Sequence, residues 1–317
     1  MASVNIKEEA EKIKSNIEKV LVGKSELINL VLTALFSGGH VLLDDVPGTG
    51  KTVLAKSLAK SINIDFKRIQ FTPDLLPSDV TGLNYYNQKV GEFVFRKGPV
   101  FTNIVLADEI NRATPRTQSS LLECMEEKQV TIDGNKYVMS NPFFVIATQN
   151  PVETIGTFPL PQAQLDRFVM KLKVGFPDIN AETDILERYI KNNPLEELQS
   201  VIDGEKLIQI MEEVKNIYVH PQLMQYLVKI VNSTRECQDI IAGVSTRGTI
   251  KFMRAAQSYA AISGRTYVTP EDIKYLAVPV LSHRIIINSG YDSNKKAEDY
   301  IQDLVNTVEV PVEDFKS

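Results

Sequence analysis

The segment 45–52 reads Asp-Val-Pro-Gly-Thr-Gly-Lys-Thr, a pattern of glycine, lysine and threonine that is typical of loops binding phosphate. Three apolar residues precede it and good helix formers follow it, which predicts a buried strand, a phosphate-binding loop and a helix. Backbone N–H groups of such a loop, and the positive end of the helix dipole, attract phosphate oxygens. Lys51 can then reach the β- and γ-phosphates, and Thr52 can ligate Mg²⁺.

Asp45 departs from the common pattern GxxxxGK[ST], which begins with glycine. Either the loop is a degenerate member of the class, or it belongs to a subfamily that tolerates aspartate there. A chance glycine-rich turn before an ordinary helix is a third alternative that this stretch alone leaves open. Other parts of the chain must therefore decide whether the loop binds phosphate.

Paired carboxylates end a second apolar run. Residues 104–107 are Ile-Val-Leu-Ala, as in a buried parallel strand, and Asp108 and Glu109 follow them. In phosphoryl-transfer sites an aspartate at a strand end holds the Mg²⁺ shell, and a neighbouring carboxylate orients and deprotonates the attacking water. We expect Asp108 and Glu109 in these two roles. An ordinary acidic turn would be the better interpretation if the pair stood alone.

Two further polar residues could contact phosphate. Asn150 follows a third buried run, residues 143–147, and its amide could sense the γ-phosphate or position water. Arg167 could reach a phosphate as an arginine finger. The simpler alternative for Arg167 is an exposed side chain paired with Asp166.

Several elements are needed to hold these residues. Apolar residues at helical spacing predict amphipathic helices over residues 6–21 and 27–35. Further strands are expected at 64–71 and 169–174. Thr114 and Pro115 have the residue types that begin a helix.

A change from mixed strand and helix patterns to helix patterns alone divides the chain into two domains. Two hairpins are expected near 82–98 and 129–139, and the aromatic residues of the first could contact a partner or simply pack. From residue 177 onward the apolar stripes predict helices only. We therefore expect an α/β nucleotide-binding domain over residues 1–176 and a helical lid domain over residues 177–317.

Composition limits the class of protein. The net charge is -5 and the isoelectric point is near 5.5, which disfavours a protein whose main task is to neutralise nucleic-acid phosphates. Two distant cysteines and three isolated histidines are a thin set for zinc. No run approaches the roughly 18 apolar residues of a membrane span, and the charged first residues do not resemble a signal peptide. We expect a cytoplasmic protein.

Taken together, the motifs at 45–52, 106–113, 147–151 and 164–168 closely resemble those of the MoxR group of AAA+ ATPases. The resemblance runs from about Val22 to about Arg284. It implies a P-loop AAA+ fold, in which helices sandwich a parallel five-stranded sheet and an all-α lid follows at the C-terminus. It also implies that the hairpins are the inserts of this branch, and that the chain assembles with itself into a ring, commonly a hexamer.

The resemblance also implies residue roles. Lys51 and Thr52 match the Walker A pair, and Asp108 and Glu109 match the Walker B pair, with Thr52 and Asp108 holding Mg²⁺. Asn150 matches the first sensor. The nucleotide-contacting set would be Val22, Gly23, Val46, Pro47, Gly48, Thr49, Gly50, Lys51, Thr52 and Val53.

Two arginines are implied at the interface between subunits. Arg167 matches the arginine finger that completes a neighbour's site. Arg247, in the stretch 245–248 that opens a helix of the lid, matches the second sensor, and either its own site or the neighbour's could use it. Thr246 stands where family members often have proline.

The function that this resemblance implies is ATP hydrolysis with Mg²⁺, driving chaperone-like remodelling or maturation of a partner complex. A von Willebrand A domain protein is the usual associate of the family. A nucleic-acid motor is one alternative, because related ring ATPases with the same insert unwind DNA, although the acidic isoelectric point counts against it. A nucleotide-gated scaffold with negligible turnover is the other, against which Glu109 argues.

Overall fold

The computed structural model describes residues 4–151, 156–190, 192–288, 295–312 and 315. At its centre is a five-stranded sheet with the order β2-β5-β8-β1-β9, in which neighbouring strands run parallel. Its strands are β1 (Val41–Asp44), β2 (Phe66–Gln70), β5 (Ile104–Asp108), β8 (Phe144–Gln149) and β9 (Met170–Leu172). The predicted α/β class with a parallel five-stranded sheet is confirmed.

The central strands are buried on both faces because nearly every residue in them is apolar. Successive side chains of a strand point to opposite faces. Val41 and Leu43 belong to one hydrophobic cluster, and Leu42 between them belongs to the other. The same alternation divides Ile104 from Val105, so the sheet separates two cores.

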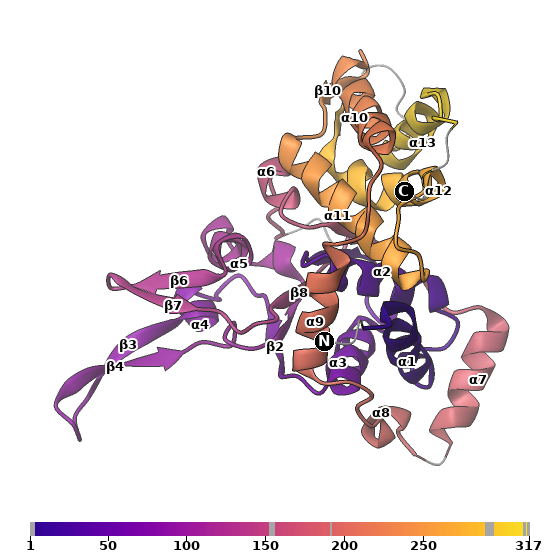
Figure 1. Cartoon of the computed structure of the whole chain (residues 1–317). Helices are drawn as coiled ribbons and strands as arrows, with labels where there is room; N and C mark the ends of the chain where they lie inside the picture. The colour runs from indigo at the N-terminus through magenta and orange to yellow at the C-terminus, as the bar shows by residue number, and fades with distance from the viewer. Residues whose placement is uncertain (1–3, 152–155, 191, 289–294, 313–314, 316–317) are drawn as a thin grey trace.

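Helices cover both faces of the sheet (Figure 1). The first cluster packs under α1 (Ile6–Glu18), α2 (Ser25–Phe36) and α3 (Lys51–Ile62). The second packs under α4 (Pro77–Thr81) and α5 (Pro115–Glu127), with η1 (Ile110–Arg112) at its edge. Thr114 is the N-cap of α5 and Pro115 is its first residue, as their residue types predict.

Two antiparallel hairpins project from one side of the sheet (Figure 1). They are β3 (Gly82–Asn87) with β4 (Glu92–Lys97), and β6 (Gln129–Ile132) with β7 (Asn135–Val138). Phe95 stacks on Tyr137 with ring centroids 4.1 Å apart, so aromatic packing joins the two hairpins. Tyr86 and Phe93 meet edge to face near the tip but stay exposed, Phe93 by 73 %.

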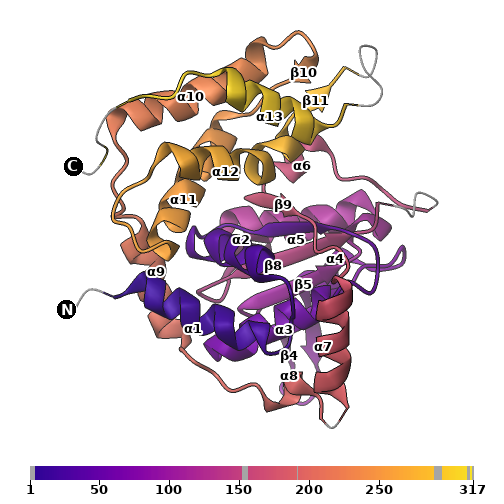
Figure 2. The ribbon, with the colours of Figure 1, turned by 90° about the vertical axis from the view of Figure 1, so that its right-hand side faces the viewer.

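A helical segment leads from the sheet to the lid. After α6 (Gln162–Leu165) and β9, the chain forms α7 (Ile179–Tyr189), α8 (Pro194–Glu197) and α9 (Gly204–Val214). Figure 2 shows α7 at the edge of the molecule. Arg188 of α7 donates to the carbonyl oxygens of Glu18 and Lys19 at 2.8 and 2.7 Å, so α7 is tied to the end of α1.

The lid is helical, with one addition to the sequence prediction. Its helices are α10 (Pro221–Glu236), α11 (Thr246–Ile262), α12 (Pro270–Leu281), η2 (Ser282–Arg284) and α13 (Ala297–Thr307). Between them lies an antiparallel ribbon of β10 (Ile240–Ala242) and β11 (Ile286–Ile287). Strands of three and two residues are too short to produce a visible alternation in the sequence.

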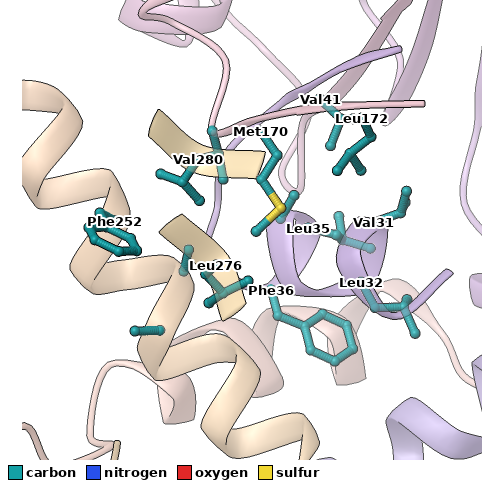
Figure 3. Packing of buried hydrophobic residues seen from close by; sticks show 14 of the residues in the cluster. Val31, Leu32, Leu35, Phe36, Val41, Met170, Leu172, Phe252, Leu276 and Val280 are labelled. Atoms are coloured by element: carbon teal, nitrogen blue, oxygen red, sulfur yellow. The ribbon is translucent and has the colours of Figure 1, made fainter. Parts of the chain in front are cut away.

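The lid and the sheet share one core. In Figure 3 Phe252, Leu276 and Val280 of the lid face Phe36 of α2 and Met170 of β9. All five side chains are buried. The lid is therefore packed directly on the part of the chain that carries the phosphate loop.

Candidate nucleotide-binding site

The loop between β1 and α3 has the backbone that a phosphate cradle needs. Gly48 and Gly50 have φ angles of 86° and 94°, a region in which residues with a Cβ are strained. Gly50 is also the N-cap of α3. A Cβ added at Gly48 would meet nothing within 4 Å, so the loop faces open space at that point.

Lys51 folds its side chain back over the loop. Its Nζ donates to the carbonyl oxygens of Asp45 at 2.7 Å and Val46 at 2.9 Å. These neutral acceptors are weak partners for an ammonium group compared with phosphate oxygens. The side chain can therefore exchange the two carbonyls for a ligand without leaving the loop.

The carboxylate of Asp45 accepts two backbone hydrogen bonds that stabilise the start of the phosphate loop. One carboxylate oxygen accepts from the N–H of Val46 at 2.7 Å, and the other accepts from the N–H of Gly175 at 2.5 Å. Gly175 follows β9, so the aspartate ties the start of the loop to the chain beyond the edge strand. A glycine at residue 45 would lack both contacts.

A cavity of about 370 Å³ lies beside this loop. It is lined by Pro47, Gly48, Gly50, Lys51, Thr52, Val53, Arg68, Asp108, Glu109 and Asn150. These residues come from the loop and from the carboxyl ends of neighbouring strands, which meet at one edge of a parallel sheet. The structure thus brings together three of the stretches that the sequence analysis singled out.

Asp108 is 8 % exposed and is held on both sides. The Thr148 hydroxyl donates to its Oδ1 at 2.6 Å, and the Arg68 guanidinium lies 2.6 Å from its Oδ2. Thr148 also accepts from the N–H of Glu109 at 2.8 Å. One buried threonine therefore ties the Asp108 carboxylate to the backbone of Glu109.

Glu109 has a left-handed backbone, with φ of 56° and ψ of 48°, which is uncommon for a glutamate. Its carboxylate accepts from the Gln70 amide and from Arg112, both at 3.0 Å. Because strained backbone often occurs at functional sites, this conformation is consistent with a catalytic role.

Arg68 and Gln70 are site residues that sequence reasoning missed. Both lie on β2, two residues apart, and Gln70 stands opposite Asp108 in the strand register. The sequence signal was available: Arg68 and Gln70 are polar residues at the carboxyl end of β2, the strand that pairs with β5 and its carboxylates.

Four of the residues that the sequence predicts to contact the nucleotide, Val22, Gly23, Val46 and Thr49, do not line this cavity. Val46 and Thr49 belong to the loop, but their side chains do not line the cavity. Gly23, next to Val22, lines a second cavity of about 440 Å³ together with lid residues such as Tyr275, Val278 and Pro279.

Arg167 and Arg247 do not line either cavity among the residues that the structure describes. Arg247, in the first turn of α11, lies 3.2 Å from Glu126 of α5. Asp166 pairs with Arg284 of η2 at 2.8 Å, not with its neighbour Arg167. Neither arginine is therefore among the described residues that surround the phosphate cavity of their own chain.

The donor set suits a magnesium ion that is shared with a nucleotide. Mg²⁺ keeps several waters and is commonly held by one or two protein oxygens plus substrate phosphates. Thr52 and Asp108 offer one hydroxyl and one carboxylate in the same cavity. Within the described ranges, no group of three or more His, Cys, Asp or Glu residues could hold a metal by itself.

Burial keeps two histidines near the sheet, His40 and His283, in their neutral form. Desolvation lowers the pKa of His40 to about 3 and lowers that of His283 well below its ordinary value. His40 accepts from the N–H of Val145, and its other ring nitrogen lies 3.2 Å from the carbonyl oxygen of Met125. The neutral ring satisfies both partners, so His40 serves the packing of the sheet.

None of the helices in the described part of the chain is long and apolar enough to cross a lipid bilayer.

Known proteins match this chain over nearly its whole length. The family described as "ATPase family associated with various cellular activities (AAA)" matches residues 40–170, and the AAA lid domain matches residues 232–304. The uncharacterized protein YeaC of Bacillus subtilis is 51 % identical over 95 % of each chain. Chaperone MoxR1 of Mycobacterium tuberculosis is 38 % identical over 93 % of this chain and 80 % of its own.

A solved structure is similar as well. The crystal structure of a candidate ATPase from Cytophaga hutchinsonii superposes with a TM-score of 0.90 and is 40 % identical. The match covers 97 % of this chain and 96 % of that one.

Proposed function

The chain belongs to the MoxR family of AAA+ ATPases, and from that premise we propose that it binds and hydrolyses ATP in the cavity beside the phosphate loop. The observation that carries this proposal is the convergence of Lys51, Thr52, Asp108, Glu109 and Asn150 on one cavity. The types of these residues match the needs of phosphoryl transfer, in which positioning and charge neutralisation do most of the work.

Each side chain has a role in this proposal. Lys51 leaves its two loop carbonyls and binds the β- and γ-phosphates. Bound Mg²⁺ would neutralise charge on the phosphate oxygens, with Thr52 and Asp108 as its protein ligands. Glu109 orients the attacking water and accepts its proton, and Asn150 contacts the γ-phosphate or that water.

The second cavity is proposed to take the base of the nucleotide. Gly23 and Val174 line this cavity. Gly175, the residue after Val174, donates its N–H to the carboxylate of Asp45 at the start of the phosphate loop. A volume of about 440 Å³ is within the range of small-molecule sites. Val22 and Gly23 would then contact the base, as the family resemblance implies.

Hydrolysis is proposed to need a second copy of the chain. Arg167 and Arg247 lie outside the described lining of the phosphate cavity, although arginines in these motifs act on phosphate in related proteins. A neighbour in a ring would supply Arg167 as an arginine finger, and such residues contribute about 10³ to 10⁵ in rate in comparable systems. A hexamer is the ring that the family resemblance favours.

The cellular role proposed is that of a chaperone. A relative that is 38 % identical carries the name Chaperone MoxR1, and this likeness supports remodelling or maturation of a partner complex. A von Willebrand A domain protein is the proposed associate. The identity of the client comes from analogy, because fold and family do not determine it.

Steady-state turnover tests the proposal against its two alternatives. Wild-type protein and a Glu109→Gln variant are compared at a concentration at which both have assembled, with and without added DNA. We expect wild-type turnover well above that of Glu109→Gln, and no stimulation by DNA. Equal rates would favour a nucleotide-gated scaffold, and DNA stimulation would favour a nucleic-acid motor.

A further inference from the structure

The short segment 166–169, which carries Arg167, is held by side chains of the lid. Lys251 of α11 donates to the carbonyl oxygens of Asp166 at 2.7 Å and of Arg167 at 2.6 Å. Arg284 of η2 donates to the carbonyl oxygens of Phe168 and Val169. Four consecutive carbonyls are therefore bound by two cationic side chains from a different part of the chain.

The side chain of Asp166 is held by the lid as well. Its Oδ1 accepts from Arg284 Nε at 2.8 Å, and its Oδ2 accepts from the Ser245 hydroxyl at 2.8 Å. Ser245 is the N-cap of α11, the helix that also carries Lys251. The contacts of this segment with the lid thus reach two of its elements, α11 and η2.

Arg284 packs so closely against α11 that residue 248 of this helix must be glycine. A Cβ added to Gly248 would lie 2.8 Å from Cδ and 3.0 Å from Nε of Arg284. Glycine therefore leaves room for this guanidinium, which is 3 % exposed. Burying a charged group is costly unless it is paired and hydrogen-bonded, and Arg284 meets both conditions.

The charges around the segment are mainly positive. Lys251, Arg284 and Arg247 stand against two carboxylates, Asp166 and Glu126. Burial lowers the pKa of Lys251 to about 7, so this ammonium group is kept in an unfavourable environment. A half-buried cation whose two hydrogen bonds both go to the backbone of one segment serves to fix that segment.

Arg167 itself is only partly satisfied within its own chain. Its Nε is buried and has no hydrogen-bond partner among the described residues. Such a donor in a folded protein calls for an explanation, because buried polar atoms are usually paired. The lid therefore holds the backbone of Arg167, while the described part of its own chain leaves one donor of the Arg167 side chain unpaired.

We propose that Lys251 and Arg284 are positioning residues: they clamp the segment 166–169 to the lid and so set the place of Arg167 for the active site of a neighbouring copy. This inference rests on the proposed function, in which Arg167 acts as an arginine finger between subunits. The lid then acts on hydrolysis in the neighbour through the arginine that its own chain presents.

Mixed assemblies test the clamp. A chain with Glu109→Gln cannot hydrolyse but presents Arg167, and a chain with Arg167→Ala has an intact Glu109 but presents no finger. In a mixture, turnover occurs only where the first chain supplies Arg167 to the second. Lys251→Met is then introduced into one partner or the other, and turnover is measured at saturating ATP.

We expect Lys251→Met to reduce turnover by up to about 10²-fold when it is in the chain that presents Arg167, because displacement of about 1 Å at a reacting centre has such effects. In the chain with Arg167→Ala the same substitution should leave turnover nearly unchanged. Lys251→Arg in the presenting chain should restore most of the rate. Lys229→Met, at an exposed position of α10, is the matched control in both chains.

The outcomes separate the two proposals. No turnover in the mixture with intact Lys251 would overturn the role of Arg167 as a finger, and the clamp with it. Turnover that Lys251→Met lowers equally from either chain, or that it leaves unchanged in both, would overturn the clamp alone. Arg284 is too buried for this test, because its removal takes from Asp166 its ion-pair partner and destabilises the lid.

Discussion

The Nη2 atom of Arg68 lies 2.6 Å from Oδ2 of Asp108, and its Nε lies 3.0 Å from the same oxygen. The pair joins β2 to β5 at the edge of the phosphate cavity. A guanidinium therefore neutralises the carboxylate that we propose as a ligand of Mg²⁺. Arg68 is about half exposed, so it can leave without disturbing the core.

The first prediction is that Arg68 competes with Mg²⁺ for Asp108. Arg68→Met should lower the Mg²⁺ concentration that gives half-maximal binding of a fluorescent ATP analogue, because the carboxylate loses its resident cation. Lys67→Met is the control, since Lys67 is its neighbour on β2 and points to the opposite face of the sheet. A Mg²⁺ requirement that is unchanged or higher in Arg68→Met would contradict the prediction.

The second prediction concerns Asp45, the residue that departs from the common phosphate-loop pattern. Its carboxylate binds the N–H groups of Val46 and Gly175. Asp45→Gly restores the common pattern but should lower the free energy of unfolding by about 1 kcal/mol, as expected when two half-buried donors lose their acceptor. Urea denaturation checks this, and an Asp45→Gly variant as stable as the wild type would refute it.

The third prediction uses the pH dependence of stability. His40 has a pKa of about 3 in the folded chain and an ordinary value of 6.5 when unfolded. Between these values the unfolded chain binds a proton that the folded chain does not, so stability is full above pH 6.5 and is lost as the pH falls toward 3. His283 contributes in the same direction.

A variant isolates the contribution of His40. His40→Phe should be less stable than the wild type at pH 7, because Val145 loses its acceptor. Its free energy of unfolding should nevertheless fall less steeply between pH 6.5 and 4, since one titrating group has gone. Equal slopes for the two proteins would show that His40 does not carry the acid sensitivity.

The fourth prediction concerns Lys251, whose pKa is lowered to about 7. Desolvation is the main cause, Arg284 and Arg247 act in the same direction, and Asp166 and Glu126 oppose them. Turnover in the mixed assembly should fall as the pH rises through 7, because a neutral amine holds the backbone carbonyls less firmly. Lys251→Arg should remove this fall, since arginine stays charged.

Stability should respond in the opposite direction. The unfolded lysine keeps its proton up to its ordinary pKa of 10.5, so the unfolded chain binds more protons above pH 7 and Lys251 makes the fold more stable as the pH rises. Turnover that rises with pH as stability does would contradict a role of Lys251 in positioning. A pH dependence of turnover that is the same in Lys251→Arg as in the wild type would contradict it as well.

The sequence predicts the fold well where chemistry and periodicity coincide. The stretch 104–107 is apolar throughout and is followed by two carboxylates, and the structure has β5 there, inside the parallel sheet between β2 and β8. The phosphate loop follows β1 in the same way. Because parallel strands end at one edge, polar residues that follow different strands converge on one cavity.

The remaining features depend on contacts that no local pattern encodes. Arg68 meets Asp108 only because β2 and β5 are neighbours, which is a property of strand order. Asp166 has two cationic candidates in the fold, and the sequence places Arg167 beside it, whereas Arg284, distant in sequence, is the one that packs against it. The ribbon of β10 and β11 is formed by residues far apart in the chain.

The most direct test of the account is a comparison of ATP binding and turnover in Lys51→Ala, Glu109→Gln and the control Lys56→Ala, which removes an exposed lysine of the same helix. We predict that Lys51→Ala binds ATP about 10- to 100-fold more weakly, the loss expected for a charge-assisted contact. Glu109→Gln should bind ATP normally without hydrolysing it, and Lys56→Ala should behave as the wild type. Unchanged ATP binding in Lys51→Ala, or wild-type turnover no faster than that of Glu109→Gln, would contradict the proposal that this cavity hydrolyses ATP.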